Sequence, residues 1–175
     1  AGPAWQVIAV PEKDAGVRPM GFMRASSAPL PFIASATKPV GTPASFSGTA
    51  ITCHAGPADN LALFGALAHG EPGDIMVCAT DGFAETAVTG DLLLGMARNR
   101  GLAGFVTDGM VRDVPGIEAV GLPCFAAGVT PNSPARNGPG TVGMPVVVGG
   151  VAVGAGDIVV GDGDGVVVVP FAAID

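Results

Sequence analysis

The chain has 175 residues, which suits one domain, and 15 acidic against 8 basic residues give it a formal charge of −7. The few Lys and Arg are scattered and aromatic residues make up 5%, so the composition excludes a basic, aromatic face for nucleic acid. It also argues against docking on an anionic membrane, and no apolar run approaches the about 18 residues of a transmembrane helix. The 28 Gly and 16 Pro predict short elements and many tight turns.

Residues 1–43 hold seven of the sixteen prolines and show no sustained helical periodicity. We therefore expect a Pro-rich N-terminal arm over 1–43, lying on a neighbouring subunit, and an α/β domain over 44–175. The first ten residues lack a basic start and a long apolar stretch, so no signal peptide is predicted. Cys53, Cys78 and Cys124 are dispersed and odd in number, which predicts buried thiols in a reducing compartment, the cytoplasm.

The domain is predicted to alternate strands and helices and to end in strands alone. Asp59 or Asn60 can cap the first helix, with Leu61, Phe64 and Leu67 on one face, and Thr89 can cap the second. The expected strands are 47–54, 74–79, 104–107, 123–127, 146–148, 151–153, 158–160 and 166–169, and the expected helices are 60–68, 89–100 and 114–120. This order predicts a mixed α/β sheet with crossover helices and a C-terminal β-meander.

Several familiar motifs are weak here. Residues 138–143 match G-x-G-x-x-G, but Pro139 and Pro145 prevent the helix that a dinucleotide site needs. Residues 162–165 resemble the start of a calcium loop but lack its later acidic ligands, which favours a turn between strands. His54 and His69 are the only histidines, which excludes a His-rich zinc site, and no G-x-S-x-G elbow is present.

Chemistry concentrates between Gly90 and Asp113. Gly90 and Asp91 open a helix whose first N–H groups lack intrahelical partners and can bind a carboxylate, although Asp91 can also simply stabilise the first turn. Farther on, Asp108, Arg112 and Asp113 follow a short apolar strand, and ligands collect at such strand ends. Arg112 offers a planar fork for oxygen atoms, and the aspartates suit Mg²⁺ or Mn²⁺. A local Arg–Asp surface pair is the alternative.

At these residues the sequence resembles a known family. Asp91, twenty intervening residues and then Arg112-Asp113 form a D-x20-R-D arrangement. It resembles the signature of the 4-hydroxy-4-methyl-2-oxoglutarate / 4-carboxy-4-hydroxy-2-oxoadipate aldolases of the RraA-like superfamily. The resemblance covers roughly residues 45–170, and its supporting stretches are residues 90–93, 106–109, 129–131, 149–151 and 164–170.

The resemblance implies an α/β fold of the RraA-like swivelling-domain type, assembled as homotrimers or hexamers with sites between subunits. It implies a pyruvate aldolase that uses a divalent metal cation, Mg²⁺ or Mn²⁺, and also decarboxylates oxaloacetate. By the motif, the backbone of Gly90, Asp91, Leu92 and Leu93 binds the pyruvyl carboxylate of an oxo-acid substrate. Arg112 contacts substrate oxygens, Asp113 holds the metal, and Asp91 positions or activates a water as base.

A metal route agrees with the residue types, because the only lysines, Lys13 and Lys38, lie outside the motif-bearing region and do not suggest a Schiff base. The rival interpretation is a non-catalytic RraA-like regulator of ribonuclease activity that binds a protein partner. The complete set of Asp91, Arg112 and Asp113 favours the enzyme. Some relatives have a methyltransferase name, but no adenosylmethionine-type Gly-rich strand–helix turn is found here.

Overall fold

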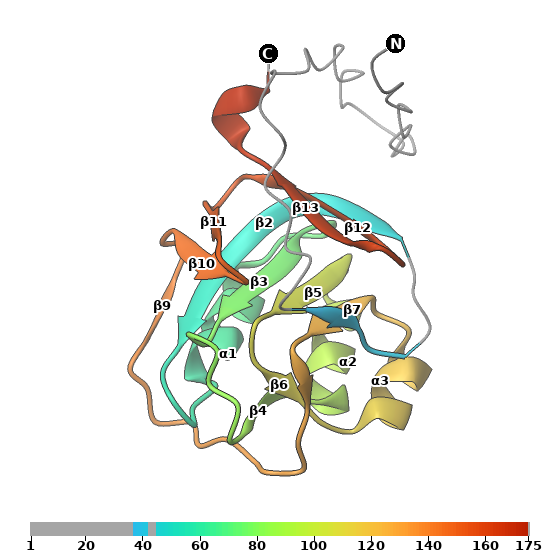
Figure 1. The fold of residues 1–175 in the computed structure, drawn as a ribbon, viewed down its shortest axis with the longest axis vertical. Coiled ribbons are helices and arrows are strands. Elements are labelled where there is room, and N and C mark those ends of the chain that lie inside the picture. Colours follow the sequence, from blue (N-terminus) through green and yellow to red (C-terminus); the bar gives the residue numbers. More distant parts are fainter. Residues whose placement is uncertain (1–36, 42–44, 175) are drawn as a thin grey trace.

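The computed structural model describes residues 37–41 and 45–174 (Figure 1). Most of the expected arm over 1–43 therefore lies outside the described residues, and its contact with a neighbouring subunit stays a prediction. Lys38–Pro39 form strand β1, which pairs antiparallel with β7 (Cys124–Ala126).

The described chain contains three α-helices, one 3₁₀ helix and thirteen short strands. The helices are α1 (Leu61–His69), α2 (Asp91–Asn99), α3 (Val114–Val120) and η1 (Phe171–Ala173). After β1 come β2 (Phe46–Ala55), β3 (Ile75–Ala79), β4 (Ala87–Thr89), β5 (Gly104–Thr107) and β6 (Met110–Val111). They are followed by β7 and by β8 (Gly128–Val129). The later strands are β9 (Gly140–Val142), β10 (Val146–Val148), β11 (Val151–Val153), β12 (Ile158–Asp162) and β13 (Gly165–Val169).

The main sheet confirms the predicted mixed α/β architecture. Its strand order is β1-β7-β5-β3-β2-β12-β13, with β9 also paired to β2. Strands β2, β3, β5 and β7 run parallel and are joined by crossovers that contain α1, α2 and α3 in turn. The antiparallel strands β1, β12 and β13 occupy the two sides of this parallel core.

Two apolar layers form because successive side chains of a strand point to opposite faces. In β3, Met76 and Cys78 pack with the helices, whereas Ile75 and Val77 pack with valines of β10 to β13. Figure 1 shows the helices grouped on one side of the parallel strands and the C-terminal strands on the other. The sheet is therefore buried on both faces, as its nearly continuous apolar strands require.

The four C-terminal strands are present, but they pair as two hairpins in two sheets rather than as one continuous meander. Strands β10 and β11 pair only with each other, whereas β12 continues the main sheet by pairing with both β2 and β13. The 162–165 segment is the turn between β12 and β13, where the Asp164 N–H donates to Asp162 Oδ1 at 2.9 Å. Its interpretation as a turn is confirmed, and Gly140 begins β9 rather than a nucleotide-binding helix.

Two details of the helices differ from the prediction. The buried face of α1 consists of Ala62, Leu63, Ala66 and Leu67, while Leu61 is 43% exposed. Thr89 does not cap α2, because it belongs to β4 and Gly90 is the N-cap residue.

The three cysteines are free and buried, as predicted. Burial raises the pKa of the Cys124 thiol to about 12. A hydrogen bond with Cys53, followed by burial, holds the pKa of Cys78 well above its usual range. These thiols therefore pack as small apolar groups and are not poised as nucleophiles. Within residues 37–41 and 45–174, no helix is long and apolar enough to cross a membrane.

Candidate functional site

A small parallel sheet, β4-β6-β8, brings the two halves of the D-x20-R-D arrangement together. Strand β4 ends at Thr89 and is followed by Gly90 and α2, whereas β6 ends at Val111 and is followed by Arg112. The Arg112 N–H donates to the Thr89 carbonyl at 3.1 Å. Because parallel strands end at the same edge, the start of α2 and the Arg112-Asp113 pair become neighbours.

Gly90 lies directly beneath this pair. A Cβ built on Gly90 would lie 2.5 Å from Asp113 Oδ2 and 3.0 Å from Arg112 Cγ, so no side chain fits there without displacing them. The backbone of Gly90 is extended, with φ −153° and ψ −165°, and any residue can adopt it. The glycine is needed here for space, not for conformation.

The guanidinium of Arg112 has partners at two of its nitrogens. Nε lies 3.2 Å from Asp113 Oδ2, with 33% and 45% of the two side chains exposed. Nη1 donates a hydrogen bond to Ser133 Oγ, from the loop after β8. The predicted local Arg–Asp pair is therefore present, and it lies at the N-terminus of α2 rather than on an isolated surface.

Asp113 adopts a left-handed backbone conformation, with φ 60° and ψ 43°, at the N-cap of α3. Non-glycine residues rarely adopt this conformation, and Asp and Asn tolerate it best. The backbone continues into the helix, because the Ile117 N–H donates to the Asp113 carbonyl at 2.9 Å. The side chain makes no cap hydrogen bond, so its carboxylate remains turned toward Gly90 and Arg112.

The first turn of α2 places the other predicted residues. Leu94 N–H donates to the Gly90 carbonyl at 3.2 Å, so the N–H groups of Asp91, Leu92 and Leu93 precede the first intrahelical bond. The Asp91 side chain is half-buried against α3, because a Cβ on Gly116 would lie 2.4 Å from Asp91 Oδ2.

The two leucines of this turn face in opposite directions. Leu93 is buried in the helix layer, whereas Leu92 is 79% exposed. The backbone N–H groups between them belong to a helix start whose outer face is open in the single chain.

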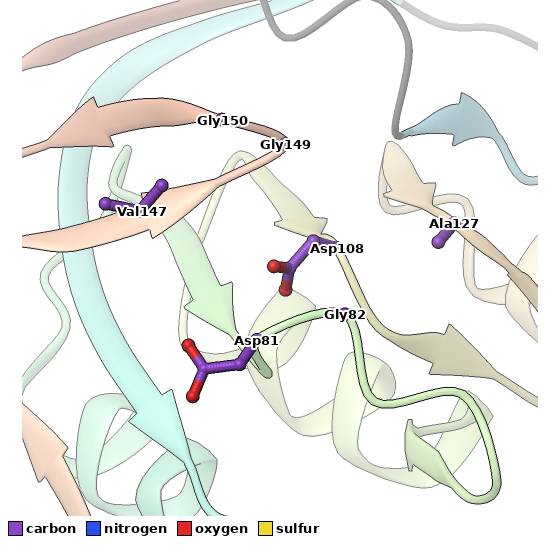
Figure 2. Close-up of a pocket in the computed structure, with 7 residues that line it drawn as sticks. All are labelled: Asp81, Gly82, Asp108, Ala127, Val147, Gly149 and Gly150. Atoms are coloured by element: carbon purple, nitrogen blue, oxygen red, sulfur yellow. The ribbon is translucent and has the colours of Figure 1, made fainter.

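Asp108 is not part of this group. Its Oδ1 accepts from the Thr80 N–H at 2.7 Å and from Thr80 Oγ1 at 3.1 Å, at the ends of β3 and β5. It lines an open depression of about 590 Å³ with Asp81, Ala127, Val147 and the Gly149–Gly150 turn, as Figure 2 shows. His54 Nε2 pairs with Asp81 Oδ2 at 2.9 Å in the same region. This depression does not include Arg112 or Asp113.

Asp113 is the carboxylate to which the motif assigns a divalent cation. Among the described residues, no group of three or more His, Cys, Asp or Glu side chains could enclose a metal. Mg²⁺ does not require such an enclosure, since it keeps several waters and is commonly held by one or two carboxylates and by substrate oxygens. A half-exposed carboxylate without a helix-cap bond fits that mode.

A family model described as "Aldolase/RraA", of the RraA-like family, matches residues 23–168. This match covers most of the chain, and the protein belongs to the RraA-like family. It begins 22 residues before the start of the resemblance found from motifs, so the similarity includes part of the expected arm.

Known relatives have names of different kinds. The chain is 38% identical over 138 residues to a protein of Halalkalibacterium halodurans named "putative 4-hydroxy-4-methyl-2-oxoglutarate aldolase"; the match covers 79% of this chain and 66% of that protein. Two solved structures are also similar: the RNA-processing inhibitor RraA from Thermus thermophilis (30% identity, TM-score 0.74, 80% and 85% of the chains) and an S-adenosylmethionine: 2-dimethylmenaquinone methyltransferase from Geobacillus kaustophilus (32%, 0.76, 81% and 87%).

Ser133 is the residue near Arg112 that the sequence did not reveal. It is the only serine after residue 47, but nothing in its local pattern indicates a distant arginine. The contact depends on how the loop after β8 crosses the end of β6, which is a property of the tertiary structure.

Proposed function

We propose that this protein is a divalent-metal-dependent pyruvate aldolase. It cleaves 4-hydroxy-2-oxo dicarboxylic acids, such as 4-hydroxy-4-methyl-2-oxoglutarate, to pyruvate and also decarboxylates oxaloacetate. The observation that supports this best is the close packing of Arg112 and Asp113 over Gly90 at the N-terminus of α2. The name of the H. halodurans relative agrees with the proposal.

The first role is substrate binding. In the proposal, the N–H groups of Asp91, Leu92 and Leu93 bind the carboxylate next to the 2-oxo group, where the positive end of the helix dipole favours an anion. Gly90 leaves room for the side chains of Arg112 and Asp113 to lie against the start of α2, next to these N–H groups. The carboxylate and the 2-oxo group of the substrate would thus lie along the edge formed by α2 and the end of β6.

The second role is the stabilisation of negative charge. Breaking the C3–C4 bond leaves an electron pair that is delocalised onto the oxygen at C2 as an enolate. The Arg112 guanidinium donates N–H groups to that oxygen as its charge develops. A divalent cation held by Asp113 supplies further positive charge to the same end of the substrate when it is bound.

The third role is proton transfer. Aldol cleavage needs the 4-hydroxyl proton to leave, and in the proposal Asp91, at the start of α2, positions or activates a water as the base that accepts it. Decarboxylation of oxaloacetate breaks the corresponding bond with release of CO₂ and leaves the same enolate, without removal of a hydroxyl proton. One site therefore suffices for both reactions.

Assembly completes the proposed site. We expect a homotrimer or hexamer, because Leu92 and Met96 of α2 are 79% and 48% exposed beside the site in the single chain. Light scattering is expected to give a mass close to three or six times 17.1 kDa. A monomer at micromolar concentration would contradict this part of the proposal.

The central experiment measures pyruvate release from 4-hydroxy-4-methyl-2-oxoglutarate and from oxaloacetate. Activity is expected with Mg²⁺ or Mn²⁺, and excess chelator should abolish it reversibly. Arg112→Ala should lower kcat by about 10²–10³, the usual cost of losing one donor to a developing oxyanion. Arg112→Lys should restore little, because an ammonium cannot reproduce the planar fork. Full activity in excess chelator would exclude the metal mechanism.

A regulatory function is the second candidate, because a solved RraA with an RNA-processing inhibitor name shares the fold at 30% identity. In that case the exposed apolar residues of α2 would contact a protein partner instead of completing a catalytic site. The same assay separates the two functions. If the wild-type chain turns over neither substrate with any divalent metal, the regulatory function becomes the better proposal.

A further inference from the structure

One hydroxyl group accepts a hydrogen bond from the guanidinium of Arg112. Ser133 Oγ accepts a hydrogen bond from Nη1, and Ser133 belongs to the loop after β8. We propose that Ser133 is a positioning residue, which fixes the rotation of the Arg112 guanidinium over the N-terminus of α2. This inference rests on the proposed function, because it specifies how that site orients its arginine.

The ion pair with Asp113 cannot fix Arg112 by itself. Both side chains are substantially exposed, and the Nε–Oδ2 distance is 3.2 Å. Such pairs contribute little in water, and an arginine side chain has several rotatable bonds to restrain. Asp113 is also the proposed cation ligand, and a carboxylate that binds a cation attracts a neighbouring guanidinium less strongly. A neutral hydroxyl group can accept the hydrogen bond from Nη1 whether or not Asp113 binds a cation.

Ser133 can act as a fixed point because its loop is anchored on both sides. Before it, the Thr130 N–H donates to the Val111 carbonyl at 3.0 Å. The Asn132 carbonyl accepts from the Ala87 N–H at 3.0 Å, and the Asn132 side-chain amide donates to the Glu85 carbonyl at 2.9 Å. These bonds attach the loop to β6 and to the chain that enters β4, which are the two strands that lead to the site.

After Ser133, the loop is attached to the start of α1. The Ala135 N–H donates to the Ala58 carbonyl at 2.7 Å, and the Asn60 N–H donates to the Ala135 carbonyl at 3.1 Å. Asp59 Oδ2 accepts from the N–H groups of Asn137 and Gly138 at 2.5 and 2.9 Å. The hydroxyl of Ser133 is thus exposed, but the backbone on each side of it is held by the main fold.

The contact also decides which donors remain for substrate. Of the five N–H groups of a guanidinium, the hydroxyl of Ser133 takes one on Nη1, and Asp113 lies against Nε. Nη2 and the second hydrogen of Nη1 stay available for an oxygen of the oxo acid. Rotation of the guanidinium would move these donors away from the oxygen at C2, and a displacement of about 1 Å can cost about 10² in rate.

The test compares Ser133→Ala with Ser133→Thr, which retains a hydroxyl, and with Thr130→Val. Thr130→Val removes a hydroxyl from the same loop, and among the described residues this hydroxyl makes no hydrogen bond to Arg112. Steady-state pyruvate release gives kcat and KM, and NMR of the Arg112 Nε–H and Nη–H groups reports rotation of the guanidinium. Ser133→Ala should lower kcat about 10- to 100-fold with little change in KM, and it should speed rotation of the Arg112 Nη groups. Ser133→Thr should recover most of both properties, and Thr130→Val should resemble the wild type.

Two results would overturn the proposal. One is wild-type rotation of the Arg112 Nη groups in Ser133→Ala, whatever the activity; the other is recovery of the NMR signature in Ser133→Thr without recovery of kcat. The NMR comparison does not need turnover. If the wild type releases no pyruvate, the aldolase proposal fails, while faster rotation in Ser133→Ala would still support the positioning contact.

Discussion

Aspartates follow parallel strands at two places in this molecule, but their surroundings differ. Figure 2 shows Asp81 and Asp108 at the ends of β3 and β5. Asp81 pairs with His54, and Asp108 accepts from both donors of Thr80. At the ends of β4 and β6, Asp113 lies beside Arg112 over the open N-terminus of α2. At the first place, the carboxylates already have hydrogen-bond or ion-pair partners in the chain itself. The second has N–H donors and a guanidinium that can still bind an anion.

This difference shows why a strand end alone does not define an anion site. The depression at Asp81 and Asp108 has a volume of about 590 Å³, but the described residues that line it include two carboxylates and no Arg or Lys, and the neighbouring His54 is paired with Asp81. The edge at Gly90 is not part of that depression, but it combines a helix N-terminus with Arg112. The chemistry of the free donors favours the second place as the substrate site.

The largest expected effect compares Asp91→Asn with Asp108→Asn, the same change at the two places. Asp91→Asn should lower aldol cleavage by roughly 10²–10⁴, the usual size of a general-base contribution, and lower decarboxylation less. Asp108→Asn keeps an oxygen that can accept from Thr80, so both activities should stay within about twofold. The measurement is kcat for both substrates.

Equal losses of the two activities in Asp91→Asn would show that Asp91 organises the site without acting as the base. A large loss in Asp108→Asn would instead transfer the proposed site to the depression in Figure 2. Oxalate binding supplies a control, since Asp91→Asn leaves the backbone N–H groups of α2 in place.

The order of strands and helices could be predicted from the sequence because the parallel strands are apolar runs flanked by helix periodicity and turn residues. Helix α3, for example, has the predicted bounds. Strands β1, β4, β6, β8 and β9 were missed, because each has only two or three residues and none contains the valine-rich run that identified β10 and β11. The predicted face of α1 was partly correct, because Leu67 is buried and Phe64 packs against the core, whereas Leu61 is 43% exposed.

The candidate site could be predicted only where a known motif contains its residues. A family motif predicted the grouping of Asp91, Arg112 and Asp113. The small sheet β4-β6-β8 is the structural reason that these residues lie close together. The close packing of Arg112 and Asp113 against Gly90 and the contact of Arg112 with Ser133 could not be predicted. Both depend on segments that are more than twenty residues apart in the sequence and that meet only after the sheet forms.

A smaller effect is expected from Gly90→Ala compared with Gly95→Ala, which is the same change at the N-cap and in the middle of α2. The Cβ at residue 90 must displace Asp113 Oδ2, from which it would lie 2.5 Å, so oxalate affinity should fall about tenfold or more. At residue 95 the nearest atom is Val120 Cγ2 at 3.7 Å, an ordinary contact. Gly95→Ala should stabilise the fold by about 0.5–1 kcal/mol and leave oxalate binding unchanged.

Calorimetric titration with oxalate and thermal unfolding measure these two outcomes. Unchanged oxalate affinity in Gly90→Ala would show that the substrate does not use this edge. Because the backbone of Gly90 is extended, a loss of affinity cannot be attributed to a forbidden backbone conformation.

The smallest expected effect concerns Asp59, which accepts hydrogen bonds from the loop that contains Ser133. Burial of Asp59 raises its pKa, but hydrogen bonds from the N–H groups of Leu61, Asn137 and Gly138 outweigh burial and leave the pKa below its ordinary value of 3.8. A lowered pKa in the folded state stabilises the protein at pH values above the ordinary pKa, and this stabilisation is lost as pH falls through the lowered pKa.

Asp59→Asn should therefore reduce the free energy of unfolding by about 1 kcal/mol at pH 7. The difference from the wild type should shrink below about pH 4, whereas Asp164→Asn, at an exposed hairpin turn, should match the wild type throughout. Urea unfolding between pH 3 and pH 7 measures both variants. A difference between Asp59→Asn and the wild type that does not depend on pH would show that the charge of Asp59 is not what holds the loop.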